Sequence, residues 1–176
     1  MTLIVVRSLA DFSAMSVTVE WGSRTMGTLA KPILLASDDS SAVFMFWRYH
    51  KQCRIHNPLE VFSDGDEVIK YLESDRLNCP LPAVLFLGMK MARMGGMEVL
   101  RHLRATCQRG FSTVLLINKE DHDLPLITAA YHLGAESFLH KPLEKKEFCS
   151  LMSRFHAVKM DGCEPSPDIA IPPTPF

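Results

Sequence analysis

The sequence predicts an α/β fold in which five parallel strands form one sheet with helices on both faces. Short apolar runs alternate with amphipathic stretches five times across residues 31–157. The third run, Ala83–Leu87, is almost wholly apolar, which is typical of a central strand covered on both sides. This alternation favours a parallel sheet, because each helix carries the chain back to begin the next strand in the same direction.

The first strand is expected at Pro32–Ala36, an apolar run that ends in a polar segment. In that segment Asp39 or Ser40 can cap a helix, since the side-chain oxygen of either residue can accept a hydrogen bond from a free backbone N–H. The helix is expected to run from about Ser41 to Gln52.

The second strand is expected at Pro58–Phe62. Ser63–Asp66 then combines a turn with a helix start, and the helix continues through Leu72. The third strand is the apolar run at 83–87. After a loop, its helix is expected from Gly96 to about Cys107, with the apolar residues facing inward.

The fourth strand is expected at Thr113–Ile117, followed by a helix near Leu124–Leu133. Gly134 is suited to end that helix, because glycine readily adopts the left-handed conformation that often follows a last helical turn. The fifth strand is expected at Ser137–His140 and the last helix at about Glu144–His156.

The 176 residues fit one globular domain, residues 31–157, with extra sequence at both ends. Residues 1–30 are either a flexible extension or residues ahead of the true start, since Met26 closely precedes the first strand. Residues 158–176 contain five prolines and are expected to form a disordered tail. A net charge of -1 and the lack of a long apolar run predict binding to neither nucleic acid nor membrane.

The five cysteines are widely spaced and never form a CxxC pair. A disulfide framework or a zinc site is therefore not expected. We predict reduced thiols in a cytoplasmic protein. The residues concerned are Cys53, Cys79, Cys107, Cys149 and Cys163.

Four aromatic residues lie close together on the first predicted helix. Phe44 and Trp47 are three residues apart and share a helix face, which predicts that they point into the core. Phe46 and Tyr49 then lie elsewhere, partly covered by a neighbouring segment or, as the alternative, exposed as a docking patch.

Polar residues follow three of the predicted strands, and a glycine follows the central one. Asp38 and Asp39 come after the first strand, Gly88 after the third, Asn118 after the fourth and Lys141 after the fifth. Because the carboxyl ends of parallel strands meet at one edge, these positions should form a pocket able to hold a hard cation such as Mg²⁺. The alternative is that the aspartates only cap a helix and that the lysine is solvated.

In this order the motifs resemble those of the response regulator receiver domain, over about Pro32 to Phe155. The resemblance implies the flavodoxin-like receiver fold, with strand order 2-1-3-4-5. It also implies phosphoryl transfer from a histidine kinase to an aspartate after the third strand, within a two-component phosphorelay. The matching segments are Ile33–Asp39, Phe62–Val68, Leu85–Leu100 and Leu133–Pro142.

The resemblance also assigns roles to individual positions. Asp38 and Asp39 correspond to the acid pair that helps to hold the metal. Lys141 corresponds to the lysine that contacts the phosphoryl group, and Phe138 corresponds to the switch aromatic residue.

The departures from the family pattern change the expected chemistry. Gly88 stands at the phosphoacceptor position and has no side chain, so no acyl phosphate can form there. Asn118 replaces the Thr or Ser that contacts phosphate, and Ala92 replaces a loop proline. Gly95-Gly96 replaces Asp-Gly, which is expected to give this loop more backbone freedom.

We therefore predict a receiver-like protein that has no catalytic residue and acts by binding a histidine kinase or another signalling protein through about Leu124–His156. Its pocket should be closed by a pair between Lys141 and a carboxylate, with weak or no Mg²⁺ binding and no other cofactor. The alternative function is a sensor of a small ligand or anion, held beside Lys141 and Asn118 in the space left by Gly88. An enzyme is not expected, because no credible pair of nucleophile and base is present.

Overall fold

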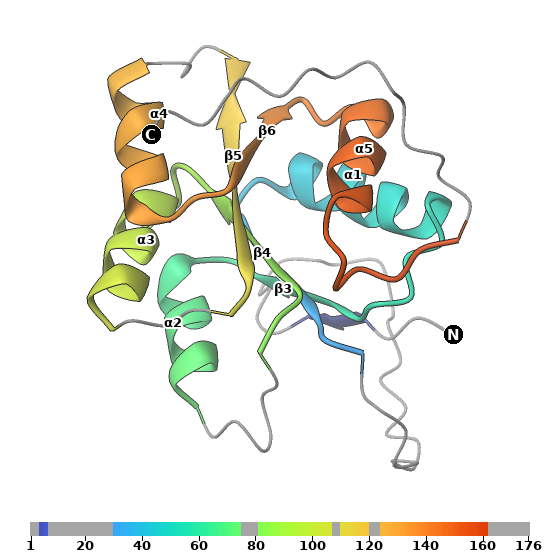
Figure 1. Ribbon diagram of the computed structural model, residues 1–176, viewed down its shortest axis with the longest axis horizontal. Coiled ribbons are helices and arrows are strands. Elements are labelled where there is room, and N and C mark those ends of the chain that lie inside the picture. The colour runs from blue at the N-terminus through green and yellow to red at the C-terminus, as the bar shows by residue number, and fades with distance from the viewer. Residues whose placement is uncertain (1–3, 7–29, 75–80, 107–109, 120–123, 162–176) are drawn as a thin grey trace.

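The structure is a computed structural model that describes residues 4–6, 30–74, 81–106, 110–119 and 124–161 (Figure 1). These residues form a six-stranded sheet in the order β1-β3-β2-β4-β5-β6, and every neighbouring pair is parallel. The strands are β1 (Ile4–Val6), β2 (Ile33–Ala36), β3 (Leu59–Phe62), β4 (Val84–Gly88), β5 (Ser112–Asn118) and β6 (Ser137–Lys141).

Strands β2 to β6 confirm the five predicted strands and their order 2-1-3-4-5. Helices connect them in turn, with α1 and α5 on one face of the sheet and α2, α3 and α4 on the other (Figure 1). The helices are α1 (Ser40–Gln52), α2 (Gly65–Glu73), α3 (Gly96–Ala105), α4 (Leu124–Leu133) and α5 (Lys145–Ser153). No helix among the described residues is both long enough and apolar enough to cross a bilayer.

Strand β1 is an addition that the sequence analysis did not predict. It lies within residues 1–30, which we assigned to an extension, and it pairs in parallel with β3 from Ile4 opposite Leu59 to Val6 opposite Val61. An unpaired edge strand exposes a row of backbone donors and acceptors, and β1 satisfies those of β3. Apart from Ala30, the rest of the extension lies outside the described residues.

The core consists of two apolar layers, one on each face of the sheet. Alternation along β2 divides its side chains between them, with Ile33 and Leu35 toward α1 and α5, and Leu34 and Ala36 toward α2 and α3. All four residues are completely buried. Burial on both sides explains why the strands appear in the sequence as continuous apolar runs.

The predicted core face of α1 was wrong. Phe46 and Tyr49 are buried, whereas Phe44 is 50% exposed and Trp47 is only partly buried. The ring of Phe46 packs edge-on against that of Phe148 on α5, with ring centres 4.8 Å apart. Four aromatic residues within six positions do not fix the rotation of a helix, and contact with α5 decided it.

The prediction that the cysteines are unpaired thiols was also wrong for one pair. Cys53, directly after α1, forms a disulfide with Cys149 on α5. The two residues are 96 positions apart in sequence, so their spacing carries no sign of the contact that the fold creates. Cys79, Cys107 and Cys163 lie outside the described residues.

Residues 158–161, which follow the predicted domain boundary at residue 157, return to the loop after α1. The Asn57 side chain is the centre of this contact: its amide donates to the backbone oxygen of Ala157 (3.0 Å), and its carbonyl accepts from the N–H of Lys159 (2.6 Å). A buried asparagine needs such partners, and proline content could not reveal them. The remainder of the predicted tail, residues 162–176, lies outside the described residues.

Candidate functional site

The polar residues predicted to meet at the carboxyl ends of the strands do lie along one edge of the sheet. Asp38 and Asp39 follow β2, Gly88 ends β4, and Asn118 and Lys141 end the neighbouring strands β5 and β6, directly opposite each other in register. Strand β2 lies between β3 and β4, so its end is the point at which the strand order reverses.

Both carboxylate oxygens of Asp39 are engaged by this chain. Oδ1 accepts hydrogen bonds from the N–H groups of Ser41 (3.0 Å) and Ala42 (3.1 Å), which caps α1. Oδ2 accepts from the ammonium group of Lys141 at 3.2 Å. The expected ion pair between Lys141 and a carboxylate is therefore present, and the cap and the ion pair occupy the same side chain.

The pKa of Asp39 lies below its ordinary value of 3.8, although partial burial alone would raise it. The hydrogen bond from Ala42, together with the hydrogen bond and the positive charge of Lys141, stabilises the ionised form more than burial penalises it. The carboxylate thus stays charged at neutral pH and keeps Lys141 beside it.

Gly88 is buried at the end of β4 and presents only backbone. A side-chain carbon added at this position would lie 3.3 Å from the carbonyl oxygen of Ala36 and 3.3 Å from Cγ of Met91. The Met91 side chain therefore occupies part of the space that a larger residue at position 88 would use.

The loop that follows Gly88 is held by Asp64, a residue that the sequence analysis treated only as part of a helix start. Asp64 is 2% exposed. Its carboxylate caps α2 through the N–H of Asp66 (3.1 Å), and it also accepts from the N–H groups of Arg93 (2.8 Å) and Met94 (3.1 Å). The loop is thereby fixed to α2, and only the tertiary structure reveals these two longer-range bonds.

The glycine pair after this loop serves close packing, a reason that we did not foresee when we expected backbone freedom. A side-chain carbon at Gly96 would lie 2.7 Å from Cδ2 of Leu115 and 2.8 Å from the carbonyl oxygen of Gly88. The N–H of Gly96 also donates to the carbonyl oxygen of Met89 at 3.2 Å. The loop therefore packs closely against the end of β4 and against Leu115 on β5.

Phe138, at the position that the resemblance gives to the switch aromatic residue, is partly buried on β6. Its ring meets that of Tyr131 on α4 edge-on, with the ring centres 5.1 Å apart. This contact joins the edge strand to α4, in which only Ala130 is buried.

The residues at this edge do not fit a divalent cation. Mg²⁺ requires several oxygen ligands around one point. Gly88 supplies no side chain, and both oxygens of Asp39 already accept hydrogen bonds, which leaves Asp38 as the one carboxylate of the pair that the cap and Lys141 do not occupy. Within the described part of the chain, no group of three or more potential metal ligands lies together.

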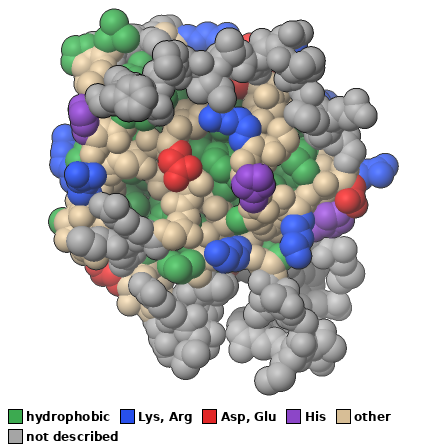
Figure 2. Space-filling view, viewed as in Figure 1, with side chains coloured by type: hydrophobic (Ala, Val, Ile, Leu, Met, Phe, Trp, Pro, Cys, Tyr) green, Lys and Arg blue, Asp and Glu red, His purple; other side chains and the backbone are tan. Residues whose placement is uncertain are grey.

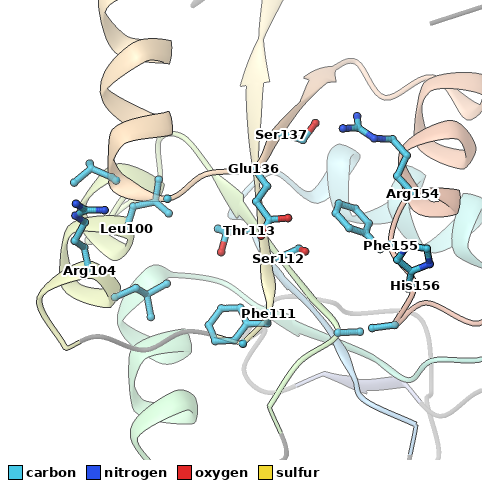
Figure 3. Close-up of a pocket in the computed structure, with 16 residues that line it drawn as sticks. Leu100, Arg104, Phe111, Ser112, Thr113, Glu136, Ser137, Arg154, Phe155 and His156 are labelled. Carbon is cyan, nitrogen blue, oxygen red and sulfur yellow. The ribbon is translucent and has the colours of Figure 1, made fainter. Parts of the chain in front are cut away.

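Hollows lie at both ends of β5 and β6 on the described part of the surface. One, of about 580 Å³, lies at the carboxyl ends of β5 and β6. Its lining includes Ser41, Met45, Asn118 and Lys141, but not Gly88. The other, of about 720 Å³, lies at the opposite ends of β5 and β6, between α3 and the segment after α5 (Figure 3). Among the described residues on the face in Figure 2, positive and negative side chains are interspersed and form no single-sign patch.

The sequence model of the response regulator receiver domain matches residues 33–153 of the chain. The chain belongs to the response regulator receiver family. Receiver domains work in two-component signalling, where they interact with histidine kinases and other signalling proteins. They are signalling domains, not enzymes by type.

A curated relative, the response regulator MprA of Mycobacterium ulcerans (strain Agy99), is 28% identical over 114 residues. The alignment covers 64% of this chain and 46% of the relative, so the chain spans less than half of the length of that protein.

Solved structures give the same family. The bacteriophytochrome response regulator RtBRR is 27% identical, with a TM-score of 0.63 over 78% of this chain and 84% of that chain. Response regulator RPA3017, from red light signaling of R. palustris, is 26% identical, with a TM-score of 0.57 over 71% and 92%. The Mn²⁺-bound form of Rcp1 shares the fold at 22% identity, with a TM-score of 0.58 over 75% and 99%.

Proposed function

We propose that this chain is a receiver-like component of a two-component pathway that acts by binding other proteins, without being phosphorylated. Gly88 carries this proposal. Acyl phosphate formation needs a carboxylate nucleophile at the phosphoacceptor position, and here that position offers only backbone. Asn118 at the phosphate-contact position adds a second departure, because its amide differs in shape and reach from a hydroxyl.

The missing carboxylate also weakens the metal site. A unit negative charge about 4 Å from a dication contributes about 8 kcal/mol at an effective dielectric constant of about 20, before desolvation is subtracted. Even a small net part of that energy changes affinity by orders of magnitude. With Asp39 committed to Lys141 and to the helix cap, Mg²⁺ binding should be weak or absent.

The binding surface that we propose runs from α4 through β6 and α5, about Leu124–His156. Helix α4 contains no Asp, Glu, Lys or Arg, and Ala130 is the one buried residue in it. Leu124 is 71% exposed and Tyr131 is 39% exposed. A histidine kinase or another cytoplasmic signalling protein would cover this apolar surface. A helix without Lys or Arg, on a chain of net charge -1, offers no cations to the phosphates of a nucleic acid or of an anionic membrane.

Phosphorylation tests the first part of the proposal. Native protein, Gly88→Asp and Gly88→Ala are incubated with acetyl phosphate and Mg²⁺ and weighed by intact mass spectrometry. Gly88→Ala introduces the same crowding against Met91 without a carboxylate, so it is the matched control. We expect no added phosphoryl group on native protein or Gly88→Ala, and an acyl phosphate on Gly88→Asp. An aspartyl phosphate on the native chain would refute the proposal.

Binding tests the second part. The cytoplasmic part of a candidate histidine kinase is titrated with native protein, and with Leu124→Glu and Tyr131→Glu. Phe44→Glu is the control, because Phe44 is also exposed but lies on α1, on the other face of the sheet. We expect the α4 substitutions to weaken binding at least about tenfold, which corresponds to about 1.4 kcal/mol, and the control to leave it unchanged. Equal effects of all three substitutions would exclude α4 as the contact.

A small-ligand or anion sensor is the second candidate function, and the hollow of about 580 Å³ beside Lys141 and Asn118 favours it. The hollow is lined by Lys141 and Asn118, as we expected from the sequence, but not by Gly88. Thermal unfolding with small organic anions distinguishes this function: a ligand present at about 100 times its dissociation constant stabilises the folded chain by about 2.7 kcal/mol. Stabilisation that Lys141→Ala abolishes would favour the sensor.

A further inference from the structure

The disulfide between Cys53 and Cys149 joins α1 to α5 across the core. Cys53 ends α1, where its N–H donates to the carbonyl oxygen of Tyr49 at 2.8 Å. Cys149 lies in the middle of α5. Each residue is 3% exposed and belongs to the apolar layer beneath α1 and α5. The bond therefore fixes one helix of the proposed binding surface to a helix outside it.

Helix α5 keeps other contacts with α1 that do not depend on the bond. The ring of Phe148 meets the rings of Phe46 (4.8 Å) and Tyr49 (5.8 Å). The Tyr49 hydroxyl donates to the carbonyl oxygen of Leu143, just before α5, at 3.2 Å. Opening the disulfide should leave this packing in place, so that the domain stays folded while α5 is held less firmly.

Permanent disulfides belong to oxidising compartments, and in a reducing compartment a disulfide is usually transient or a sensor. We proposed a cytoplasmic place for this chain, in a pathway whose members exchange signals there. In that compartment, the disulfide that holds α5 is expected to form and break with the redox state.

We propose that Cys53 and Cys149 form a reversible redox site, whose disulfide state holds α5 and whose dithiol state loosens it. The reversibility rests on the proposed cytoplasmic location and the affected surface rests on the function proposed above, but the thiol titration that tests the redox chemistry needs no partner. The partner reagents are a low-molecular-weight disulfide for oxidation and a thiol for reduction.

The exchange balances in two steps. One cysteine thiolate attacks the small disulfide, forming a mixed disulfide and releasing one small thiolate. The second cysteine thiolate attacks the protein sulfur of that mixed disulfide and releases the second small thiolate. The two cysteine sulfurs lose two electrons, the small disulfide gains them, and the two protons of the cysteines end on the released thiols. Reduction reverses both steps.

Access to the buried sulfurs requires a local opening. Release of residues 158–161 from the loop after Cys53 is the opening that we propose. The N–H of His56 donates to the carbonyl oxygen of Lys159 at 2.8 Å, and the His56 ring meets the Asp161 carboxylate at 2.7 Å. His56 and Asp161 are both exposed, but the buried side chain of Asn57 also holds this segment through Ala157 and Lys159, so its release must break buried as well as surface contacts. We expect slow exchange that follows release of this segment.

The test uses the full chain with Cys79, Cys107 and Cys163 changed to Ser, so that the pair alone can react. The protein is equilibrated in glutathione buffers from fully reduced to fully oxidised, quenched with acid, alkylated and weighed. We expect both thiols to disappear together at an intermediate ratio, and a Cys53–Cys149 linked peptide in the digest. Thiols that remain free in every buffer, or a bond that survives in every buffer, would overturn the proposal.

Hydrogen exchange reads the consequence without any partner. We expect the amides of α5 to exchange at least about tenfold faster in the reduced protein, while those of α3 change little. The disulfide closes a long loop, and its loss should shift the global unfolding equilibrium roughly a thousandfold toward the unfolded state. The amides of α3 are therefore compared under conditions in which exchange occurs by local opening and not by global unfolding. Identical α5 exchange in the two states would refute the loosening.

Cys149→Ala supplies a matched control, because its α5 amides should exchange at one rate whatever the glutathione ratio. If that variant does not fold, the reduced protein with both cysteines present still gives the measurement. Kinase binding is then compared between the redox states in a separate experiment. Failure of binding there would count against the proposed function, whereas the thiol titration would stand or fall on its own.

Discussion

Lowering the pH from about 7 to about 5 should destabilise the protein through His50, which is completely buried on α1. The pKa of His50 falls from 6.5 to about 4. Burial is the largest cause, because it penalises the charged ring, and the positive charge of Lys51 adds to it. The hydrogen bond between Nε2 and the carbonyl oxygen of Asn57, at 2.9 Å, acts in the opposite direction but is outweighed.

The sign follows from which state binds the proton. Between pH 4 and 6.5 the unfolded chain holds a proton on His50 that the folded chain excludes, so the stability is complete above 6.5 and declines as the pH falls toward 4. With these two values, the loss between about pH 7 and about pH 5 is about 2 kcal/mol. Nδ1 of the same ring has no hydrogen-bond partner, so the folded state offers no second contact to a protonated ring.

Urea unfolding of native protein and His50→Leu at the two pH values measures this effect. We expect the variant to lose about 2 kcal/mol less than the native chain between them. His156→Ala, at an exposed histidine, is the control and should keep the native difference. A pH dependence that is the same in His50→Leu and the native chain would refute the reasoning.

Two further predictions concern the loop and the rotation of α1. Asp64→Ala removes a helix cap and leaves two loop N–H groups without their acceptor, so we expect a loss of about 2–4 kcal/mol in urea unfolding, whereas Asp66→Ala, at a more exposed position, should lose under about 1 kcal/mol. Comparable losses for the two variants would mean that the buried bonds matter little. Phe46→Ala should cost about 3–5 kcal/mol and Phe44→Ala about 0.5 kcal/mol, by the same measurement. A larger loss of stability for Phe44→Ala than for Phe46→Ala would support the core face of α1 that was predicted from the sequence.

Much of the fold follows from patterns that are local in the sequence. Continuous apolar runs identify strands because both faces of this sheet are covered, as the complete burial of Leu34 and Leu35 shows. Asp39 acts over two and three residues as a helix cap, so its role is visible in sequence. The polar residues at the strand ends could be placed together, because parallel strands end at one edge.

The sequence by itself determined the strand order through its family motifs, the edge at which the polar residues meet, and the absence of a side chain at Gly88. The tertiary structure alone decided the rotation of α1, the disulfide of Cys53 and Cys149, and the hold of Asp64 on the loop after β4. The reason is the distance along the chain over which each is fixed. Helix caps and strand patterns depend on near neighbours, whereas these three features depend on partners about 30 to 100 residues away, which come into contact only after the sheet and its helices have packed.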